Sequence, residues 1–278
     1  MIDEDSIVTK KIKHVFLNKI IDREDVLAIE EPLEIQLSYM VDGIRVRKSI
    51  SVTMRTPGND EELAVGFLFT EGIIQQPGQI KNARISAVEN NKVLVSLNDG
   101  VIPNLSTTER NFYTTSSCGV CGKSSIDSIK TNSVYGKQNH AVTVKSHVLL
   151  ELIHLLEKQQ SVFLRTGGLH ASALFDLEGT FLLLREDVGR HNALDKVLGS
   201  AFLKAEMPLN NSILLLSGRA SFELIQKATM AGIQIIVAIG APSSLAVQLA
   251  EESGITLAGF MRKETFNIYS GYERIETL

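Results

Sequence analysis

The sequence has little of what marks three common classes of protein. Its only two cysteines, Cys118 and Cys121, form a single Cys-x-x-Cys pair, which is not the pattern of a secreted domain held together by disulfides. Its most apolar stretches, such as Ile233–Ile239, are far shorter than the roughly 20 residues that a membrane-spanning helix needs. Its formal net charge of −4 argues against a protein that coats nucleic acid, although it leaves room for a local basic pocket. The cysteine pair is therefore expected to take part in redox, sulfur or metal chemistry.

What is present is the composition of a soluble globular protein. The 278 residues are 44% hydrophobic and 22% charged, and this length suffices for one large domain or two of ordinary size. The segment Met1–Lys11 carries three acidic residues ahead of its first lysine and has no apolar core. It therefore matches neither a secretory signal nor an Arg-rich transit peptide, and we expect a cytoplasmic protein.

The first half of the chain is predicted to be rich in strands. Asp42-Gly43 is a hairpin signal between two segments of alternating apolar and polar residues, and a polar turn separates a second pair. The four segments are Pro32–Ser38, Ile44–Met54, Arg84–Val88 and Val93–Leu97. Asn59, with Glu62 three residues later, predicts a capping box at the start of a helix. Ser146 is predicted to cap another helix.

The second half alternates between short apolar runs and helical patterns. The apolar runs are Phe181–Leu184, Ile213–Leu216, Ile233–Ile239 and Thr256–Met261, and the helical segments between them are Asn192–Lys204, Ser221–Ala231 and Ser243–Ser253. This order predicts βαβ units around a mostly parallel sheet. We therefore expect an α/β fold, α+β overall, with a β-rich domain at 1–138 that ends in the cysteine loop and an α/β domain at 139–278.

The composition around the two cysteines favours an exposed, mobile loop. A glycine follows each cysteine, and Ser116 and Ser117 precede the pair, so two buried thiols fit this segment less well. A sulfur carrier needs a thiolate that attacks a sulfur donor, holds the sulfur as a persulfide and reaches a second site. The adjacent Lys123 would favour the thiolate. A disulfide redox pair remains the main alternative, although the context is not the βαβ setting of a thioredoxin-type motif.

Zinc binding is disfavoured. A structural zinc site usually takes four ligands, so His170 or His191 would have to complete a site with the two cysteines. A zinc deaminase carries His-x-Glu followed by Pro-Cys-x-x-Cys. Here Ser172 stands where that glutamate would be, Ser117 stands where the proline would be, and the cysteines come first. We expect no metal site.

Three predicted strand ends in the second half carry arginine. Asp187–Asn192 follows the first strand, Ser217–Ser221 follows the second, and Arg262-Lys263 follows the fourth. Ligands of parallel sheets bind beyond the carboxyl ends of the strands, where free helix N–H groups and guanidinium groups both suit phosphate. We expect a nucleotide or pyrophosphate ligand, although each arginine alone could be a solvated surface residue. Gly167–His170 fits either a turn with a core histidine or part of this site.

Four of these segments together closely resemble the FdhD family, the formate dehydrogenase accessory sulfurtransferases. The segments are Ser117–Lys123, Thr166–Ser172, Asp187–Lys196 and Ser217–Arg219, and the resemblance runs from about Glu30 to Arg274. It implies a second domain like the cytidine deaminase fold and a homodimer. It also implies transfer of sulfur from a cysteine desulfurase to the bis-molybdopterin guanine dinucleotide cofactor before that cofactor enters formate dehydrogenase.

The resemblance also assigns roles to residues. Cys118 matches the cysteine that bears the persulfide, and Phe260–Thr265 looks like the family's cofactor-binding segment. The catalytic candidates are Cys118 and Cys121, and the cofactor-binding candidates are His170, Gly189, Arg190, His191, Ser217, Gly218, Arg219, Phe260, Met261, Arg262, Lys263, Glu264 and Thr265. A thiol-disulfide redox protein and a cofactor-binding chaperone without sulfur chemistry remain as alternatives. The role of Cys121, the desulfurase and the metal of the cofactor, molybdenum or tungsten, stay open.

Overall fold

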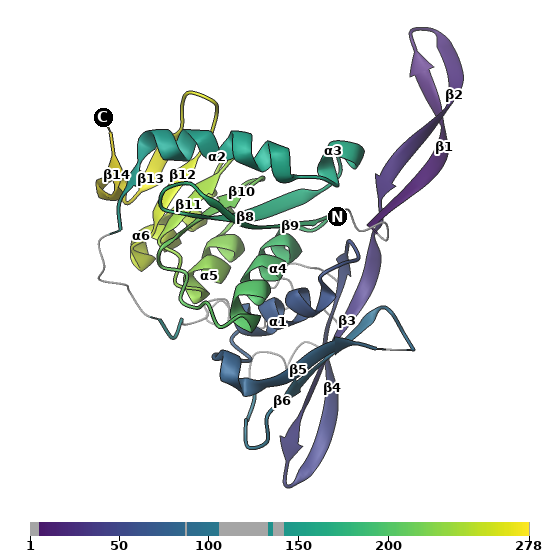
Figure 1. Cartoon of the computed structure of the whole chain (residues 1–278), viewed down its shortest axis with the longest axis vertical. Coiled ribbons are helices and arrows are strands. Elements are labelled where there is room, and N and C mark those ends of the chain that lie inside the picture. Colours follow the sequence, from purple (N-terminus) through teal and green to yellow (C-terminus); the bar gives the residue numbers. More distant parts are fainter. Residues whose placement is uncertain (1–5, 87, 106–132, 136–141, 278) are drawn as a thin grey trace.

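The computed structural model describes residues 6–86, 88–105, 133–135 and 142–277. Within these ranges the chain forms a six-stranded sheet, a four-stranded sheet and a protruding two-stranded hairpin, with helices between the two larger sheets (Figure 1). Cys118, Cys121 and the predicted domain boundary near residue 138 lie outside the described residues. The predictions made for them therefore stay predictions.

The six-stranded sheet confirms the four strands that the apolar runs predicted. They are β9 (Phe181–Asp187), β10 (Ser212–Leu216), β11 (Ile235–Ala238) and β12 (Thr256–Gly259). The strand order is β13-β12-β11-β10-β8-β9, and β10, β11 and β12 run parallel. The strands β8 (His170–Asp176) and β13 (Asn267–Ser270) were not predicted, and both are antiparallel to their neighbours. β8 was not predicted because two of its buried residues, Ala171 and Ala173, have a low strand propensity.

Helices cover both faces of this sheet (Figure 1). Three of them confirm the predicted helices and lie on one face: α4 (Arg190–Leu203), α5 (Phe222–Met230) and α6 (Ser244–Ser253). α2 (Ser146–Gln159) lies on the other face. Along β10, Leu214 and Leu216 join the apolar cluster that contains α4 and α5, whereas Ile213 and Leu215 join the cluster that contains α2. Successive side chains of a strand point to opposite faces, so β10 supports both cores.

The predicted hairpins form the four-stranded sheet, in the order β4-β3-β6-β5. Its strands are β3 (Glu31–Val41), β4 (Ile44–Arg55), β5 (Ile80–Ile85) and β6 (Lys92–Leu97). The helix α1 (Asp60–Thr70) packs against this sheet and against α4. A Cβ atom on Gly66 would lie 1.9 Å from the carbonyl oxygen of Asp195, and one on Gly199 would lie 1.8 Å from that of Glu62. Glycine therefore permits the close approach of α1 and α4, and apolar residues of both sheets share one core.

Two helix starts differ from their predicted capping. α1 begins after Asn59 as predicted, but Asn59 has a left-handed backbone (φ 56°) and its side chain makes no capping hydrogen bond. Glu62 instead pairs with Arg185 of β9 at 2.5 Å, so the predicted capping box is wrong. Ser146 is the first residue of α2 and not its cap, because Lys145 occupies the cap position. For Glu62, an ion pair with a residue 123 positions later in the chain outweighed the local pattern.

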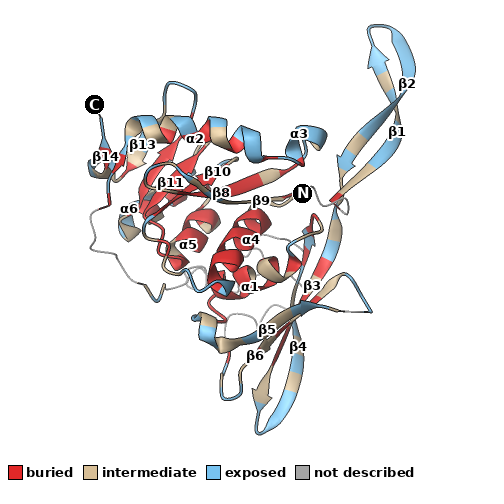
Figure 2. Ribbon diagram, in the orientation of Figure 1, coloured by how far each residue is buried: buried red, intermediate tan, exposed pale blue. Residues whose placement is uncertain are grey.

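A hairpin of β1 (Ile7–Phe16) and β2 (Lys19–Ala28) projects from the body of the molecule and was not predicted (Figure 1). Most of its residues are exposed (Figure 2). Because neither face is buried, its sequence lacks the apolar alternation that identified the other hairpins. The remaining short elements are α3 (Phe163–Thr166), β7 (Val144–Lys145), β14 (Ile275–Glu276) and two 3-10 turns, η2 (Pro77–Gln79) and η4 (Tyr272–Arg274). No helix in the described part of the chain is long and apolar enough to cross a bilayer.

Candidate functional site

The carboxyl ends of four strands meet at one edge of the six-stranded sheet. β9 is antiparallel to β8, and β8 is antiparallel to β10, so β9 runs in the same direction as β10, β11 and β12. The start of β8, at His170, lies at the same edge because β8 runs the opposite way. The loops that follow the strands are therefore neighbours, which is the arrangement that the sequence predicted for a ligand site.

The loops after β10 and β11 enclose a cavity of about 300 Å³. α5 and α6 both begin here, since their cap residues Ser221 and Ser243 line the cavity. The other lining residues are Arg190, Arg219, Ala220, Ala241 and Pro242. Helix N-termini and guanidinium groups both attract anions, so the cavity has the chemistry of a phosphate or carboxylate site.

Backbone contacts hold these two loops against each other. The N–H of Ser243 donates to the carbonyl of Ala220 at 3.0 Å, and the N–H of Gly240 donates to that of Gly218 at 2.9 Å. A Cβ atom on Gly240 would lie 2.9 Å from Cγ of Arg219 and 3.0 Å from its Cα. The absence of a side chain at Gly240 therefore allows the loop after β11 to approach the backbone of Arg219.

Arg190 and Arg219 are available to a ligand. The Nε atom of Arg190 is buried without a hydrogen-bond partner, and no ion pair to either guanidinium group occurs within the described ranges. A buried donor without a partner costs on the order of 1–3 kcal/mol. A bound anion would supply the missing acceptor.

A buried ion pair supports the loop that carries Arg190. Asp187, at the end of β9, is fully buried and lies 2.8 Å from Nζ of Lys196. Gly189, predicted to bind the cofactor, donates its backbone N–H to Asp187 at 2.8 Å. Thr56, which follows β4, donates its N–H to Asp187 at 3.2 Å, and its carbonyl accepts from Lys196 at 2.8 Å. The position of Arg190 therefore depends on contacts between the two sheets.

Replacing Lys196 by methionine is expected to destabilise the fold strongly. The change leaves Asp187 buried without its counter-charge, and such a loss costs about 3–5 kcal/mol. Urea unfolding followed by circular dichroism measures the free energy of unfolding. Lys158→Met, at an exposed position of α2, is the control and should stay within about 0.5 kcal/mol of wild type. A loss for Lys196→Met no larger than that of the control would contradict the role of this pair.

Both predicted histidines lie beside the cavity. His191 is buried in the first turn of α4, and its Nε2 atom is 3.5 Å from Oγ of Ser221. Burial, followed by the positive charge of Lys227, lowers the pKa of His191 from 6.5 to about 4. Burial also lowers the pKa of His170, whose Nδ1 atom would lie 3.3 Å from a Cβ atom on Gly218. Two neutral imidazoles thus stand near the guanidinium groups and can exchange hydrogen bonds with a ligand.

The lowered pKa of His191 predicts a loss of stability in mild acid. The unfolded chain binds the proton near pH 6.5, whereas the folded chain binds it only near pH 4, so the free energy of unfolding falls as the pH drops through this window. The full shift corresponds to about 3 kcal/mol. Urea unfolding between neutral pH and about pH 4 should show a steeper loss for wild type than for His191→Gln. Equal slopes for the two proteins would contradict this burial argument.

The segment 260–265 lies at the same edge, after β12, but does not line the cavity. The Nη1 atom of Arg262 donates to the carbonyl of Ile239 at 3.0 Å and to that of Met261 at 2.8 Å. The hydrogen bond to Ile239 therefore holds the segment 260–265 against the end of β11. Met261 is buried, and the exposed members of the segment are Phe260, Arg262, Lys263, Glu264 and Thr265.

The segment 260–265 still adjoins the cavity. A Cβ atom on Gly259 would lie 3.0 Å from Cδ of Pro242, which lines the cavity. Phe260, the next residue, has a left-handed backbone (φ 51°) and an exposed side chain. A ligand that extends from the cavity along the sheet edge would meet this side chain first.

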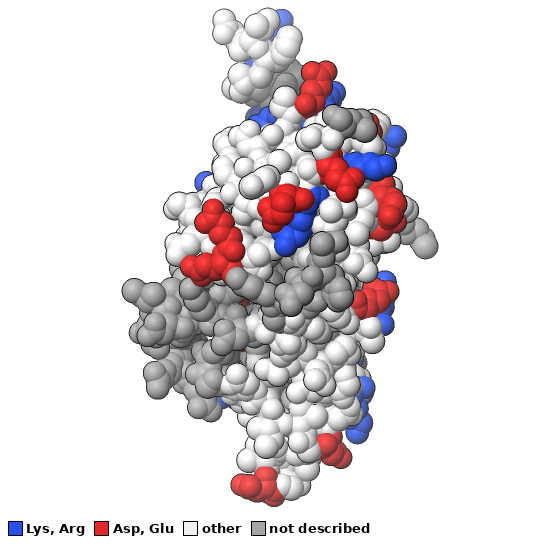
Figure 3. Space-filling model, turned by 90° about the vertical axis from the view of Figure 1, so that its left-hand side faces the viewer, with Lys and Arg blue, Asp and Glu red and all other residues white. Residues whose placement is uncertain are grey.

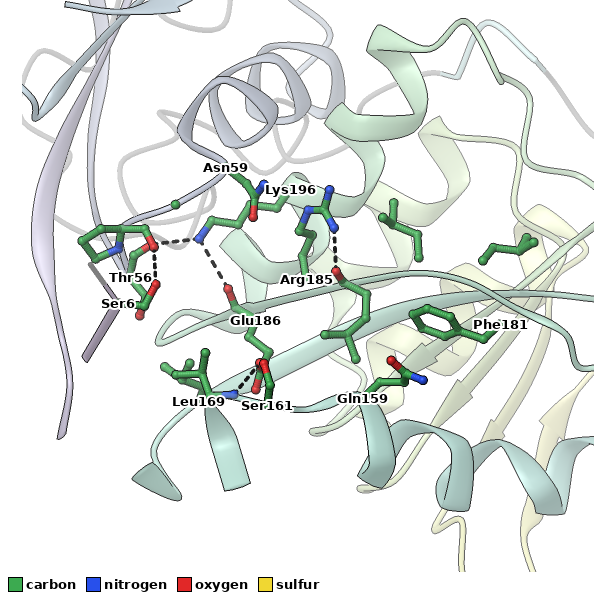
Figure 4. Close-up of a pocket in the computed structure, with 16 residues that line it drawn as sticks. Ser6, Thr56, Asn59, Gln159, Ser161, Leu169, Phe181, Arg185, Glu186 and Lys196 are labelled. Atoms are coloured by element: carbon green, nitrogen blue, oxygen red, sulfur yellow. Dashed lines mark hydrogen bonds between the residues drawn. The ribbon is translucent and has the colours of Figure 1, made fainter. Parts of the chain in front are cut away.

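A second cavity, of about 310 Å³, lies on the outer side of β9 (Figure 4). Two long side chains reach the unpaired edge of β9 here. Arg185 donates to the carbonyl of Leu184 at 2.8 Å, and Lys196 donates to that of Glu186 at 3.4 Å. Carbonyl groups that an added strand would need are already bonded, which protects this edge. None of the predicted site residues lines this cavity.

The structure brings together part of the predicted site and places the rest at its margins. Around or beside the first cavity lie His170, Arg190, His191, Gly218 and Arg219. Ser217 supports the sheet, because its Oγ atom accepts from the backbone N–H of Ala171 at 2.8 Å. The loop 239–243 was missed because it carries no arginine. Its Gly-Ala-Pro-Ser sequence after a strand was the available signal.

The described residues hold no group of three His, Cys, Asp or Glu side chains suited to a metal ion. On the face shown in Figure 3, acidic and basic side chains are interspersed. In a protein of net negative charge, any attraction of the cavity for anions would come from the local placement of its guanidinium groups and helix N-termini.

Comparisons with known proteins agree on one family. The sequence model described as "FdhD/NarQ family" matches residues 28–276. The chain is 47% identical over 274 residues to the "Sulfur carrier protein FdhD" of Mycolicibacterium paratuberculosis, which covers 96% of this chain and 97% of that protein. It is 48% identical over 262 residues to the protein of the same name from Streptomyces coelicolor, which covers 91% of this chain and 90% of the relative.

A solved structure is similar over almost the whole chain. It is the crystal structure of a protein from Desulfotalea psychrophila described as a candidate formate dehydrogenase accessory protein. The match has a TM-score of 0.72 at 25% sequence identity and covers 97% of this chain and 99% of the other. The fold described above is therefore that of this structure.

Proposed function

The chain belongs to the FdhD/NarQ family, and we propose that it carries sulfur as a persulfide on Cys118 to the bis-molybdopterin guanine dinucleotide cofactor of formate dehydrogenase. The names of its relatives support the carrier role. The cavity between the starts of α5 and α6 supports the binding of the cofactor, because two arginines and two helix N-termini line it. A cysteine desulfurase as donor, a homodimeric chain and a cytoplasmic location are parts of the same proposal.

The first step is a sulfur transfer between two cysteines. The thiolate of Cys118 attacks the terminal sulfur of a persulfide on the desulfurase. A new S–S bond forms on Cys118, the S–S bond of the donor breaks, and the donor cysteine leaves as a thiolate. The exchange needs no external oxidant or reductant. Lys123, two residues after Cys121, would favour the attacking thiolate.

The second step needs another thiol, and Cys121 supplies it. Once the cofactor is bound, the Cys121 thiolate attacks Sγ of Cys118, the bond from that atom to the terminal sulfur breaks, and hydrosulfide leaves while a disulfide forms between the two cysteines. The hydrosulfide is then available as a ligand for the metal of the cofactor. A dithiol reductant restores the two thiols for the next cycle.

The nucleotide end of the cofactor fits the cavity by its charge. A diphosphate can accept charge-assisted hydrogen bonds from Arg190 and Arg219 and backbone N–H groups at the starts of α5 and α6. The buried Nε atom of Arg190 would gain the acceptor that it lacks. His191, neutral near pH 7, can add a hydrogen bond without adding charge.

Mass spectrometry tests the carrier step. After incubation with a cysteine desulfurase and cysteine in the absence of the cofactor, the chain should gain about 32 Da for the transferred sulfur, and a dithiol reductant should remove it. A sample without desulfurase is the control. An unchanged mass in the complete mixture would overturn the carrier proposal and would favour a redox thiol protein or a cofactor-binding chaperone.

A further inference from the structure

The outer face of the four-stranded sheet carries a basic groove that plays no part in the proposed sulfur chemistry. The groove has a volume of about 510 Å³. Its floor residues alternate along the strands with Leu33, Ile35, Leu37 and Val95, which are buried on the side that packs on α1. The groove therefore opens away from the rest of the protein. Its lining residues are Gln36, Ser38, Arg45, Arg47, Arg84, Ile85, Ser86, Glu89, Lys92, Leu94 and Ser96.

The charge in this groove is only partly balanced. Arg45 pairs with Asp99, and Lys92 pairs with Glu89 at 2.8 Å. Within the described ranges, Arg84 donates only to the side-chain oxygen of Asn82, at 3.3 Å, and Arg47 forms no hydrogen bond or ion pair. Two guanidinium groups are thus left without a carboxylate, although the chain as a whole has a net charge of −4. Their natural partner is an anion.

The two arginines without a carboxylate partner belong to the two edge strands of the sheet. Arg47 belongs to β4 and Arg84 belongs to β5, and the order β4-β3-β6-β5 puts two strands between them. Three intervals of about 4.8 Å separate these edge strands by about 14 Å. An extended peptide rises about 3.4 Å per residue. Side chains four residues apart in it point the same way and are separated by about 14 Å, which matches the separation of the two edge strands.

The floor of the groove suits a peptide better than a phosphate. All of its lining residues lie on strands or on the turn between β5 and β6, so no helix N-terminus offers a cluster of N–H groups. The floor offers instead the polar side chains of Ser38 and Gln36 and, beside them, the apolar side chain of Leu94. A floor with both polar and apolar side chains can contact both the polar and the apolar side chains of a peptide.

From these observations we infer that the groove binds an extended acidic segment of a partner protein, with two carboxylates four residues apart held by Arg47 and Arg84. The site is separate from the cysteine pair and from the cavity at the strand ends, because its lining residues all belong to the four-stranded sheet and its turn. A partner could therefore remain bound here while the sulfur chemistry proceeds.

Fluorescence anisotropy with two labelled eight-residue peptides tests this inference on the full chain. Both peptides contain two glutamates among threonines and valines, either four residues apart or adjacent. We expect the spaced peptide to bind at least about fivefold more tightly, and the double variant Arg47→Glu/Arg84→Glu to lose at least about tenfold in affinity for it. Binding should also weaken as salt is raised.

The matched control is Lys81→Glu/Lys158→Glu, which makes the same change of net charge at exposed positions outside the groove. It should keep its affinity within about twofold. Equal affinities for the two peptides, or equal losses for the two double variants, would overturn the inference. So would displacement of the peptide by pyrophosphate at concentrations where the unlabelled peptide fails. If the charge-reversed protein does not fold, Arg47→Gln/Arg84→Gln gives the same comparison.

Discussion

Replacement of Cys118 by alanine should abolish the mass gain of about 32 Da that a cysteine desulfurase confers on the wild-type chain. Cells that depend on this variant should have no formate dehydrogenase activity. The reason is chemical: without the Cys118 thiolate, no atom at that position can form the S–S bond that holds the sulfur. Mass spectrometry of the intact chain and an assay of formate oxidation in cell extracts measure the two effects.

Cys121→Ala separates the two steps of the proposed cycle. This variant should still gain the sulfur on Cys118 but should keep it, because the thiol that forms the disulfide is missing. Ser117→Ala, next to Cys118 in the sequence, is the control and should behave as wild type in both assays. A mass gain in Cys118→Ala equal to that of wild type would show that the sulfur is carried elsewhere.

Arg219→Ala should weaken the binding of GDP, a stand-in for the nucleotide end of the cofactor, by at least about tenfold. Arg219 lines the cavity beside the starts of α5 and α6 and has no ion pair within the described residues. Its loss removes a charge-assisted hydrogen bond to phosphate, which is worth about 1.5–3 kcal/mol. Isothermal titration calorimetry measures the change in Kd.

Two other arginines calibrate this result. Arg262→Ala should also weaken GDP binding, but less, because the Nη1 atom of Arg262 already donates to two backbone carbonyls and supports the neighbouring segment. Arg23→Ala, at an exposed position of the β1–β2 hairpin, should leave the affinity unchanged. If Arg219→Ala binds GDP as tightly as Arg23→Ala does, the cavity is not the nucleotide site.

Much of the fold was predictable because its core strands are strongly patterned. The apolar run that became β11 (Ile235–Ala238) is buried on both faces, and the alternation in β3 (Glu31–Val41) reflects one buried face. β8 was missed because small residues such as Ala171 occupy its buried positions. The β1–β2 hairpin was missed because a strand with no buried face carries no hydrophobic period.

The site was predictable where it depends on strand order and much less where it depends on contacts between distant segments. Parallel strands put Arg190 and Arg219 beside one cavity, as the sequence indicated. By contrast, the hydrogen bond from the N–H of Thr56 to Asp187 joins segments 131 residues apart, and no local pattern encodes it. The role of Arg262 toward the ligand stays a prediction, and the sequence did not indicate that its Nη1 atom bonds backbone carbonyls of its own loop and of the end of β11.

The central claim is that sulfur passes through Cys118 on its way to the cofactor, and following one labelled sulfur atom tests it most directly. The chain, loaded with the cofactor, is supplied with a cysteine desulfurase and cysteine that carries radioactive sulfur. The label should appear first on the chain and then in the extracted cofactor, in an amount equal to that which the chain loses. Label that reaches the cofactor equally well through Cys118→Ala, or that never leaves the wild-type chain, would contradict the account.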